Sequence, residues 1–308
     1  MTSELYSVAR TLAPAKVNLA LFVGSRRADG FHDLATIFQA ISLADEVCVV
    51  LGDAGAGPDE HGPVRLVMEG PELGPVEENL AWRAAAAFMR EVRIDAPISV
   101  FLRKEIPAGA GLGGGSSDAA AVLRCLSALA GGSPPGLLEA IAASLGSDVP
   151  FFLGPSGTAI GEGRGERIEA VDALPEQLIA VALPPVHVAT GPAYRALTSS
   201  RTGGTVAPLP ALDRRFSWAE LVGGRMANDF EEVVSAQFVP VEESLSAMRE
   251  AGAAVAMLSG SGAASFALFG PWTDTGGFAR WCAGVSTTLG WPVVPCTTLG
   301  LIPPVNLS

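Results

Sequence analysis

The sequence is poor in histidine and cysteine, the side chains that most often bind transition metals. It has three histidines and four widely separated cysteines, namely Cys48, Cys125, Cys282 and Cys296. No pair has the spacing of a zinc site, and a chain of 308 residues does not need a disulfide framework. The G-x-S-x-G turn of α/β-hydrolases is also absent. We therefore expect reduced, mostly buried thiols, with little scope for zinc or serine-hydrolase chemistry.

Positive charge is scarce as well. The formal net charge is −12 and no run of Lys or Arg occurs, which disfavours nucleic acid or an anionic membrane surface as a partner. The N-terminus carries Glu4, Arg10 and Lys16 without a long apolar core, so it does not resemble a signal peptide. The long uncharged run at 251–273 contains too much glycine and serine to suggest a membrane span. We expect a cytoplasmic protein that is a monomer or homodimer and has no nucleic-acid or membrane partner.

The composition that remains is that of a globular protein, because 49% of the residues are hydrophobic and 17% are charged. The length allows two domains or one large one, and we place a boundary near residue 170. One face of a predicted helix at 78–92 carries Leu80, Ala84, Ala87 and Phe88. Other helical patterns begin at Ser117, Leu137 and Val239, and strand patterns occupy 16–23, 46–51, 64–69, 97–106 and 177–188.

The most informative stretch is IPAGAGLGGGSSDAAAVL at 106–123, which has five glycines between Gly109 and Gly115. Glycines before a helix N-terminus let backbone N–H groups approach a ligand, and phosphate is the anion most often bound this way. No lysine follows the glycines, so the Walker A pattern is excluded. Gly109, Gly111 and Gly114 match the G-x-G-x-x-G dinucleotide pattern, without an acidic residue about twenty positions on. A phosphate loop, a dinucleotide site and a tight turn all stay open at this point.

This stretch resembles the phosphate loop of the GHMP kinases, which include galactokinase, homoserine kinase and mevalonate kinase. Gly-Gly-Gly before Ser-Ser-Asp is similar to the branch whose members phosphorylate 4-diphosphocytidyl-2-C-methyl-D-erythritol. Four further stretches resemble that branch in the expected order: 13–47, LGSDVPFFL at 145–153, ANDFEEVV at 227–234 and LSGSGAASFALF at 258–269. The resemblance thus extends from about residue 13 to about residue 270.

The resemblance implies an α+β, two-domain GHMP kinase fold. Residues 1–170 would form an ATP-binding domain like domain 2 of ribosomal protein S5, and residues 171–308 a ferredoxin-like domain on the substrate side. The reaction would transfer the γ-phosphate of ATP to the 2-hydroxyl of 4-diphosphocytidyl-2-C-methyl-D-erythritol. The products would be the 2-phosphate and ADP, in non-mevalonate isoprenoid precursor biosynthesis.

The resemblance also assigns the nucleotide site. Backbone amides of the loop would bind the ATP phosphates, and Asn79 would lie near the adenine. The hydroxyl of Ser116 or Ser117 would be nearest to Mg²⁺, and no carboxylate is obviously dedicated to the metal. The implied ATP-binding residues of the loop are Pro107, Ala108, Gly109, Ala110, Gly111, Leu112, Gly113, Gly114, Gly115, Ser116 and Ser117.

Two residues match the catalytic positions of the family. Asp148 would orient the acceptor hydroxyl and take its proton, and Lys16 would pair with Asp148 and neutralise charge near the γ-phosphate. Asn18 would share the face of Lys16 on a strand and contact the substrate or the catalytic pair. Without the family, the residues favour a turn or helix-capping carboxylate for Asp148 and a strand-end lysine with its ammonium in water for Lys16.

The acceptor site is implied by GFHDL at 30–34 and by the second glycine loop. Members of the branch often have Tyr-His where this chain has Phe31 and His32, so the stacking face is kept and the phenol hydrogen bond is lost. Residues Ser259, Gly260, Ser261 and Gly262 would close over the acceptor, and Asp229 would support them structurally. A turn-capping histidine and a tight turn between core strands are the alternatives.

Three rival functions stay open. A kinase for a sugar, homoserine or mevalonate would share the fold, but its acceptor has no pyrimidine for Phe31 and His32. A non-catalytic ligand-binding relative would not need both Lys16 and Asp148. A nicotinamide oxidoreductase would be indicated by tight NAD binding without ATP binding.

Overall fold

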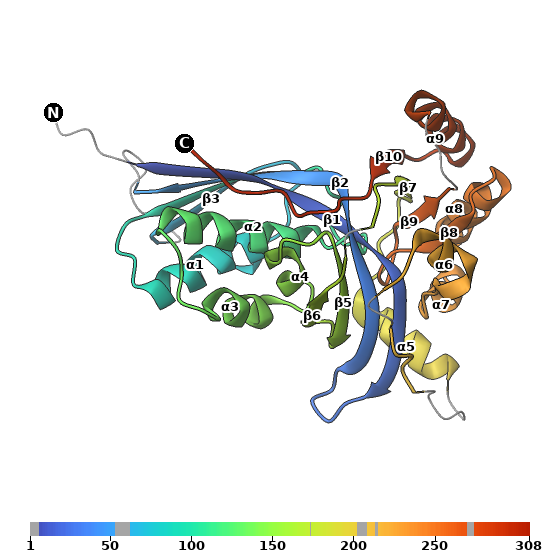
Figure 1. Ribbon diagram of the computed structural model, residues 1–308, viewed down its shortest axis with the longest axis horizontal. Coiled ribbons are helices and arrows are strands. Elements are labelled where there is room, and N and C mark those ends of the chain that lie inside the picture. The colour runs from blue at the N-terminus through green and yellow to red at the C-terminus, as the bar shows by residue number, and fades with distance from the viewer. Residues whose placement is uncertain (1–5, 53–61, 173, 202–207, 213–214, 270–273) are drawn as a thin grey trace.

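A computed structural model describes residues 6–52, 62–172, 174–201, 208–212, 215–269 and 274–308. A large sheet with its helices and a small sheet with its helices lie at opposite ends of an elongated molecule (Figure 1). In the part of the chain so described, no helix is long and apolar enough to cross a membrane. All four cysteines are free, Cys48 being half-buried and the others buried, as expected.

The large sheet is organised around one long hairpin. Strand β1 pairs along most of its length with β2, and β2 pairs with β5 through its first half and with β4 through its second. The order is β11-β1-β2-β4-β3; β5 pairs with β2, and β6 pairs with β5. Only β3–β4 is parallel among these pairs. The strands are β1 (Ser7–Arg26), β2 (His32–Leu51), β3 (Val64–Glu69), β4 (Ile98–Arg103), β5 (Thr158–Gly163), β6 (Arg167–Ala170) and β11 (Asn306–Leu307).

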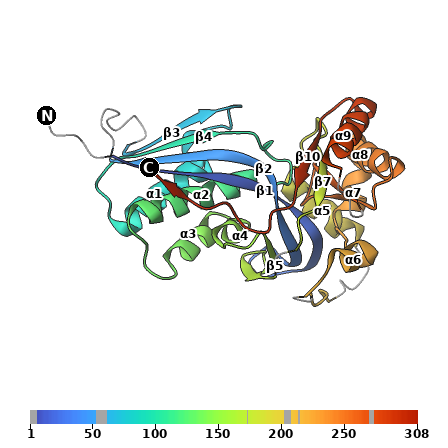
Figure 2. The ribbon, with the colours of Figure 1, turned by 45° about the horizontal axis from the view of Figure 1, so that its top comes forward.

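Four helices cover one face of this sheet (Figure 2). They are α1 (Leu80–Val92), α2 (Gly114–Leu129), α3 (Leu137–Leu145) and α4 (Val149–Leu153), and the 3-10 turn η1 (Val76–Glu78) precedes α1. The prediction of the buried face of α1 was partly wrong. Ala84 and Phe88 are buried as expected, but Ala81 and Ala85 complete the buried stripe while Leu80 and Ala87 are half-buried.

The start of α2 also differs from the prediction. The helix begins at Gly114 rather than Ser117, so the two serines lie inside its first turns. Glycine is a poor helix former, which is why Gly114 and Gly115 suggested a loop. Here Gly113 precedes the helix with φ +71°, and the missing Cβ of Gly114 lets the backbone lie close to Ile106. Asp118 is accordingly the fifth residue of the helix and lies beyond its first turn.

The small sheet has the order β10-β7-β9-β8 and is antiparallel throughout. Its strands are β7 (Leu178–Ala182), β8 (Val255–Leu258), β9 (Ser265–Leu268) and β10 (Val293–Thr297). The surrounding helices are α5 (Thr190–Ser200), α6 (Trp218–Glu220), the π-helical turn η2 (Leu221–Arg225), α7 (Glu231–Ser235), α8 (Val239–Glu250) and α9 (Thr275–Leu289). The helix predicted from Val239 is confirmed. Residues 255–268 form strand β8, the second glycine loop and strand β9.

One of the hydrophobic clusters spans both halves. Val17 and Leu19 of β1 belong to the same buried cluster as Ile179 and Phe266 of the small sheet. The chain then returns, since β11 pairs with β1 and the C-terminus lies along the large sheet (Figure 2). Strand β1 thus lies in a buried cluster that contains residues from both halves. The domain boundary near residue 170 stays a prediction.

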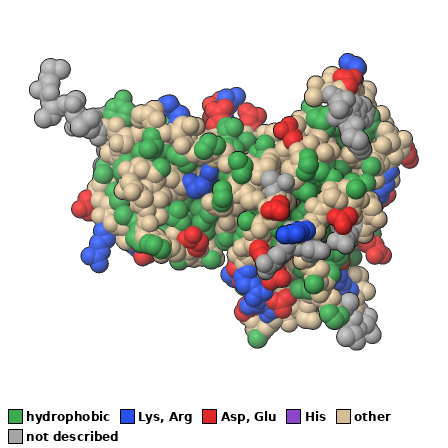
Figure 3. Space-filling view, in the orientation of Figure 1, with side chains coloured by type: hydrophobic (Ala, Val, Ile, Leu, Met, Phe, Trp, Pro, Cys, Tyr) green, Lys and Arg blue, Asp and Glu red, His purple; other side chains and the backbone are tan. Residues whose placement is uncertain are grey.

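The β1–β2 hairpin projects from the body of the molecule and ends in a charged turn. The N–H of Arg27 donates to the carbonyl of Phe31 at 2.6 Å, and Gly30 has φ +87°. The guanidinium of Arg27 bonds Asp29 and Asp33, each at 3.0 Å. Side chains of both charges gather over this projection (Figure 3). The turn places Phe31 and His32 at the tip, next to α5 (Figure 1).

Candidate active site

Lys16 and Asp148 lie together at the centre of the molecule. Lys16 comes from β1 and Asp148 precedes α4, and Nζ is 3.5 Å from Oδ2. The Lys16 side chain is 4% exposed and that of Asp148 is 32% exposed. Lys16 Nζ also donates to Asn18 Oδ1 at 2.7 Å, and Asn18 Nδ2 donates to Thr36 Oγ1 at 2.8 Å. The ammonium is therefore held in one place, while the carboxylate faces a pocket.

The glycine-rich loop (residues 107–113) packs directly against Lys16. The backbone N–H of Lys16 donates to the carbonyl of Leu112 at 2.9 Å. A Cβ on Gly113 would lie 3.0 Å from Lys16 Cγ, and a Cβ on Gly111 would collide with the carbonyl oxygen of Ser259. Gly111 also has φ +78°, a conformation that other residues rarely adopt. Glycine is thus required here by contact as well as by backbone conformation.

The loop leads into an uncapped helix N-terminus. No side chain caps α2, and its first backbone bond runs from the Ser117 N–H to the Gly113 carbonyl at 2.9 Å. The N–H groups of residues 114–116 precede that bond and lack an intrahelical acceptor. They adjoin a cavity of about 340 Å³. Of the predicted ATP-binding residues, Asn79 and 107–116 line this cavity, whereas Ser117 is buried and its Oγ has no hydrogen-bond partner.

The second loop (residues 259–262) lies against the glycine-rich loop. Ser259 Oγ donates to the Gly111 carbonyl at 3.1 Å, and a Cβ on Gly260 would lie 3.3 Å from Lys16 Nζ. Ser259, Gly260 and Gly262 are buried, and Ser261 Oγ is 3.2 Å from Thr190 Oγ1. The structure therefore places these four residues beside Lys16 and the glycine-rich loop, and not in the wall of the pocket that Asp148 faces.

That pocket, the aromatic pocket, has a volume of about 760 Å³. Phe31 is 51% exposed, and the Arg164 guanidinium lies 4.8 Å from its ring centroid. The His32 ring stacks on Tyr194 at 5.2 Å, and His32 Nδ1 lies 3.0 Å from the Gly24 carbonyl. The lining residues are Arg26, Gly30, Phe31, His32, Leu34, Ser147, Asp148, Arg164, Thr190, Gly191, Tyr194, Arg195, Thr198 and Ser199.

The charge of the aromatic pocket is opposite to that of the whole chain. Arg26, Arg164 and Arg195 line it, against the single carboxylate of Asp148 among the described lining residues. Burial, with a contribution from the Asp148 carboxylate, raises the pKa of Tyr194 to about 12. Tyr194 therefore stays neutral, and the pocket can accept an anionic ligand with an aromatic ring.

A buried ion cluster (Asp45, Lys104 and Asp118) lies beneath the glycine-rich loop. Lys104 Nζ bonds Asp118 Oδ2 at 2.6 Å and also bonds Asp45 Oδ2. Burial raises the pKa of Asp118 to about 7, although Lys104 opposes the shift. Burial also acts to lower the pKa of Lys104, but the two carboxylates outweigh it and the pKa ends above its usual value. Lys104 is therefore a charged ammonium inside the protein.

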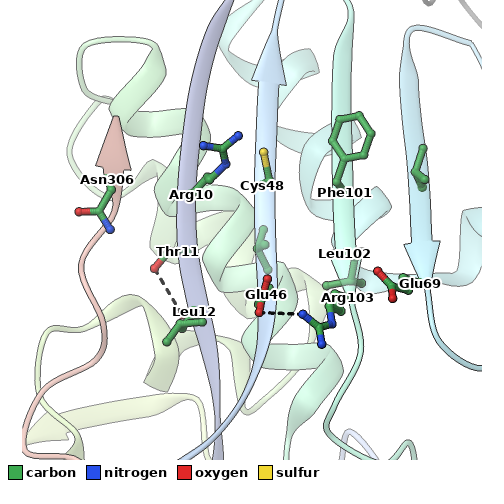
Figure 4. Close-up of a pocket in the computed structure, with 12 residues that line it drawn as sticks. Arg10, Thr11, Leu12, Glu46, Cys48, Glu69, Phe101, Leu102, Arg103 and Asn306 are labelled. Atoms are coloured by element: carbon green, nitrogen blue, oxygen red, sulfur yellow. Dashed lines mark hydrogen bonds and ion pairs between the residues drawn. The ribbon is translucent and has the colours of Figure 1, made fainter. Parts of the chain in front are cut away.

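A separate hollow lies on the open face of the large sheet (Figure 4). Arg10, Cys48 and Phe101 project into it from three adjacent strands, and Arg103 bonds Glu46 at 3.3 Å. None of the predicted site residues lines this hollow. Among the residues with described positions, no group of three His, Cys, Asp or Glu side chains could hold a metal ion.

Several side chains of the site were not predicted from the sequence. They are Thr36, Arg164, Tyr194, Arg195 and the buried ion cluster. Two of these residues could have been singled out because their residue types are rare in this chain. Tyr194 is one of two tyrosines, and Lys104 is one of two lysines. The arginines carried no such signal, because arginine is common here.

Comparison with known proteins agrees with this geometry. The families described as GHMP kinases N terminal domain and GHMP kinases C terminal match residues 79–154 and 210–275. The 4-diphosphocytidyl-2-C-methyl-D-erythritol kinase of Anaeromyxobacter dehalogenans is 45% identical over 263 residues, covering 84% of this chain and 80% of that protein. The protein of that name from Geobacter metallireducens is 38% identical over 292 residues, covering 93% and 97%.

Solved structures are similar over nearly the whole chain. A crystal structure of 4-(cytidine 5'-diphospho)-2C-methyl-D-erythritol kinase is 36% identical with a TM-score of 0.74, covering 94% of this chain and 99% of the other. Homoserine kinase from Cytophaga hutchinsonii is 17% identical with a TM-score of 0.67, covering 99% and 98%, and shares the fold. The chain is therefore a small-molecule kinase of the GHMP family, and within it belongs to the 4-diphosphocytidyl-2-C-methyl-D-erythritol kinases.

Proposed function

We propose that this kinase transfers the γ-phosphate of ATP to the 2-hydroxyl of 4-diphosphocytidyl-2-C-methyl-D-erythritol, giving the 2-phosphate and ADP in isoprenoid precursor biosynthesis. The observation that carries the proposal is the aromatic pocket beside Asp148, which combines aromatic rings with three arginines. A nucleobase joined to a diphosphate has the matching chemistry. The name shared by the most similar relatives supports the same substrate.

Phe31 and His32 recognise the cytosine in this proposal. The exposed ring of Phe31 offers a π-face for stacking, which every base can use. In the neutral imidazole of His32, Nδ1–H donates to the Gly24 carbonyl and Nε2 is left as an acceptor. The exocyclic amino group of cytosine is a donor of the kind that Nε2 can bind. Tyr194, stacked on His32, holds the imidazole plane in place.

The arginines of the pocket bind the diphosphate. Guanidinium groups form paired, charge-assisted hydrogen bonds to phosphate oxygens. Arg26, Arg164 and Arg195 line the same pocket as the aromatic rings, so base and diphosphate can be bound together. Homoserine, mevalonate and galactose carry neither group.

The glycine-rich loop and the N-terminus of α2 bind the ATP phosphates. The fit rests on the cavity beside residues 114–116 and on the N-terminus of α2, which no side chain caps. Ser116 lines that cavity, so its hydroxyl is the one placed to reach Mg²⁺, and Asn79 lies at the same cavity. Mg²⁺, held mainly by ATP oxygens and water, would supply neutralisation of phosphate charge.

Asp148 and Lys16 act on the acceptor hydroxyl. Asp148 Oδ2 accepts the proton as the hydroxyl oxygen forms its bond to the γ-phosphorus, and ADP leaves with the electrons of the broken bond. In a loose transition state the proton leaves late, so the reaction does not require a strong base. Lys16 holds Asp148 in position at 3.5 Å and stabilises charge on the transferred group. Asn18 fixes the Lys16 ammonium.

An acceptor panel tests the proposal. ADP release with Mg-ATP is measured against 4-diphosphocytidyl-2-C-methyl-D-erythritol, homoserine, mevalonate and galactose. We expect turnover with the cytidyl acceptor alone. Turnover with another acceptor would overturn the assignment of the aromatic pocket. ATP binding without any turnover would instead favour a non-catalytic relative.

Asp148→Asn is the matched control for that panel. Removal of a general base costs about a thousandfold in rate, and we expect kcat to fall by about this factor while the KM for ATP stays within about twofold. The amide keeps the shape of the carboxylate, so folding is preserved. An equal loss of ATP affinity would mean that Asp148 has a structural role.

A further inference from the structure

The chain has two lysines in 308 residues, and both contact the glycine-rich region. Lys16 belongs to the catalytic pair, whereas Lys104 has no part in the reaction described above. Its Nζ lies 3.5 Å from the position of a Cβ on Gly114, and Lys104 lines the cavity beside the loop. Its partners are the two carboxylates of the buried ion cluster, and the side chains of all three are less than 5% exposed.

The cluster joins the two ends of the glycine-rich loop. At the entry, Asp45 Oδ1 accepts from the backbone N–H groups of Glu105 and Ile106, at 2.6 and 2.8 Å. At the exit, Asp118 lies on α2, four residues after the helix begins. Lys104 bonds both carboxylates at once, so it ties the segment before the loop to the helix after it. Asp45 belongs to strand β2, so the segment before the loop and helix α2 are both attached to the large sheet.

Such a cluster is a costly way to gain stability. Removing three charged groups from water carries a desolvation penalty that their attraction only partly offsets, and apolar residues of similar volume are often no less stabilising. The positions of the bonds are what distinguish this cluster. They connect the segment before the glycine-rich loop with the helix after it. We propose that Asp45, Lys104 and Asp118 are positioning residues, which hold the glycine-rich loop in the conformation that binds the nucleotide phosphates.

This inference rests on the proposed binding of ATP at the glycine-rich loop. Asp118→Asn tests it above pH 7, where the Asp118 carboxylate is mostly ionised, because the amide keeps the shape of the side chain and removes that charge from the cluster. A small displacement of a positioned group can cost up to about a hundredfold. We expect the Kd of Mg-ADP and the KM for ATP to rise at least about tenfold, while kcat at saturating ATP and the KM of the acceptor stay within about twofold.

Arg103→Gln is the matched control. Arg103 is the neighbour of Lys104, but its ion pairs with Glu46 and Glu105 are half-exposed or more and lie on the open face of the sheet. The Arg103→Gln substitution should leave the Kd of Mg-ADP unchanged. Calorimetry with Mg-ADP needs no turnover, so it tests the cluster even if the acceptor is wrong. An unchanged Kd in folded Asp118→Asn, or an equal rise in Arg103→Gln, overturns the proposal.

The wild-type chain allows a test without a variant. Protein labelled with ¹⁵N at the lysine side chains has only two ammonium groups to observe. Lys104 is buried between two carboxylates, so its protons should exchange slowly with water and give a detectable signal. We expect this signal to shift when Mg-ADP binds, because Lys104 lines the cavity and is bonded to both ends of the loop that contacts the phosphates. Binding of Mg-ADP without a shift overturns the proposal.

Discussion

At the residue scale, burial separates the roles of Lys16 and Asp148. The Lys16 ammonium is 4% exposed, bonds Asn18 and lies 5.7 Å from the centroid of the Phe38 ring, so its position is determined by its neighbours. Asp148 is about one-third exposed at the edge of the aromatic pocket. A fixed cation and an accessible carboxylate suit charge stabilisation and proton acceptance respectively.

Phe31 should contribute to acceptor binding by stacking alone. Stacking of a base on an aromatic side chain is worth ~1–3 kcal/mol by alanine substitution, so Phe31→Ala should raise the KM of the cytidyl acceptor by about tenfold or more. The KM for ATP should not change. Phe101→Ala is the control, because Phe101 is an exposed phenylalanine on the open sheet face. Equal effects of the two substitutions on the acceptor would contradict this role for Phe31.

Tyr194 should keep its proton well above the usual range. Its pKa is raised from 10.0 to about 12, so between these values the native state binds a proton that the unfolded state has released. The free energy of unfolding should therefore fall as the pH rises through this window. Tyr6→Phe leaves Tyr194 as the only tyrosine, and a tyrosinate absorbance titration of that variant reports Tyr194 directly. A native midpoint near 10 would show that Tyr194 is solvated.

At the element scale, the glycine-rich loop is determined by contacts with other segments. Its residues accept hydrogen bonds from the N–H of Lys16, the N–H of Ala264 and the hydroxyl of Ser259. The loop is thus held between β1 and the second loop. Its amide groups are left to bind a ligand, as in other phosphate sites at helix N-termini.

Gly111→Ala should damage this element. An alanine at positive φ costs ~1–3 kcal/mol, and here its Cβ would also meet the Ser259 carbonyl. We expect a lower free energy of unfolding in urea and a large rise in the KM for ATP. Gly284→Ala is the control, because Gly284 is exposed within α9 and its Cβ would meet nothing. That variant should be neutral or more stable by up to ~1 kcal/mol. Equal stability of both variants would contradict the close packing of the loop.

At the scale of the whole molecule, net charge and local charge have opposite signs. The chain carries −12, yet three arginines line the pocket beside Asp148. These arginines come from β1, from the turn after β5 and from α5, segments that are far apart in the sequence. The acidic surface thus coexists with a cationic site for an anionic acceptor.

The sequence by itself determined the local features of this protein. The glycine run, the lone Lys16 on an apolar strand, and the periodicity of the 64–69 strand and the 137–145 helix each depend on residues close in the chain, and the structure confirms the elements there. The order of the motifs indicated the family. Helix boundaries such as Gly114 were missed, because contacts with Lys104 and Ile106 outweigh the poor helix propensity of glycine.

Only the tertiary structure decided which distant residues meet. The stacking of Tyr194 on His32 and the bonds of Asp45 to the segment before the glycine-rich loop join positions more than fifty residues apart. The arginines of the pocket come from three separate segments of the chain. No local pattern encodes such contacts, since they follow from how β1 and β2 bring the two halves together. The return of residues 306–307 to β1 has the same origin. Chemistry was readable from short motifs, whereas the shape and charge of the acceptor pocket depend on the packing of the entire chain.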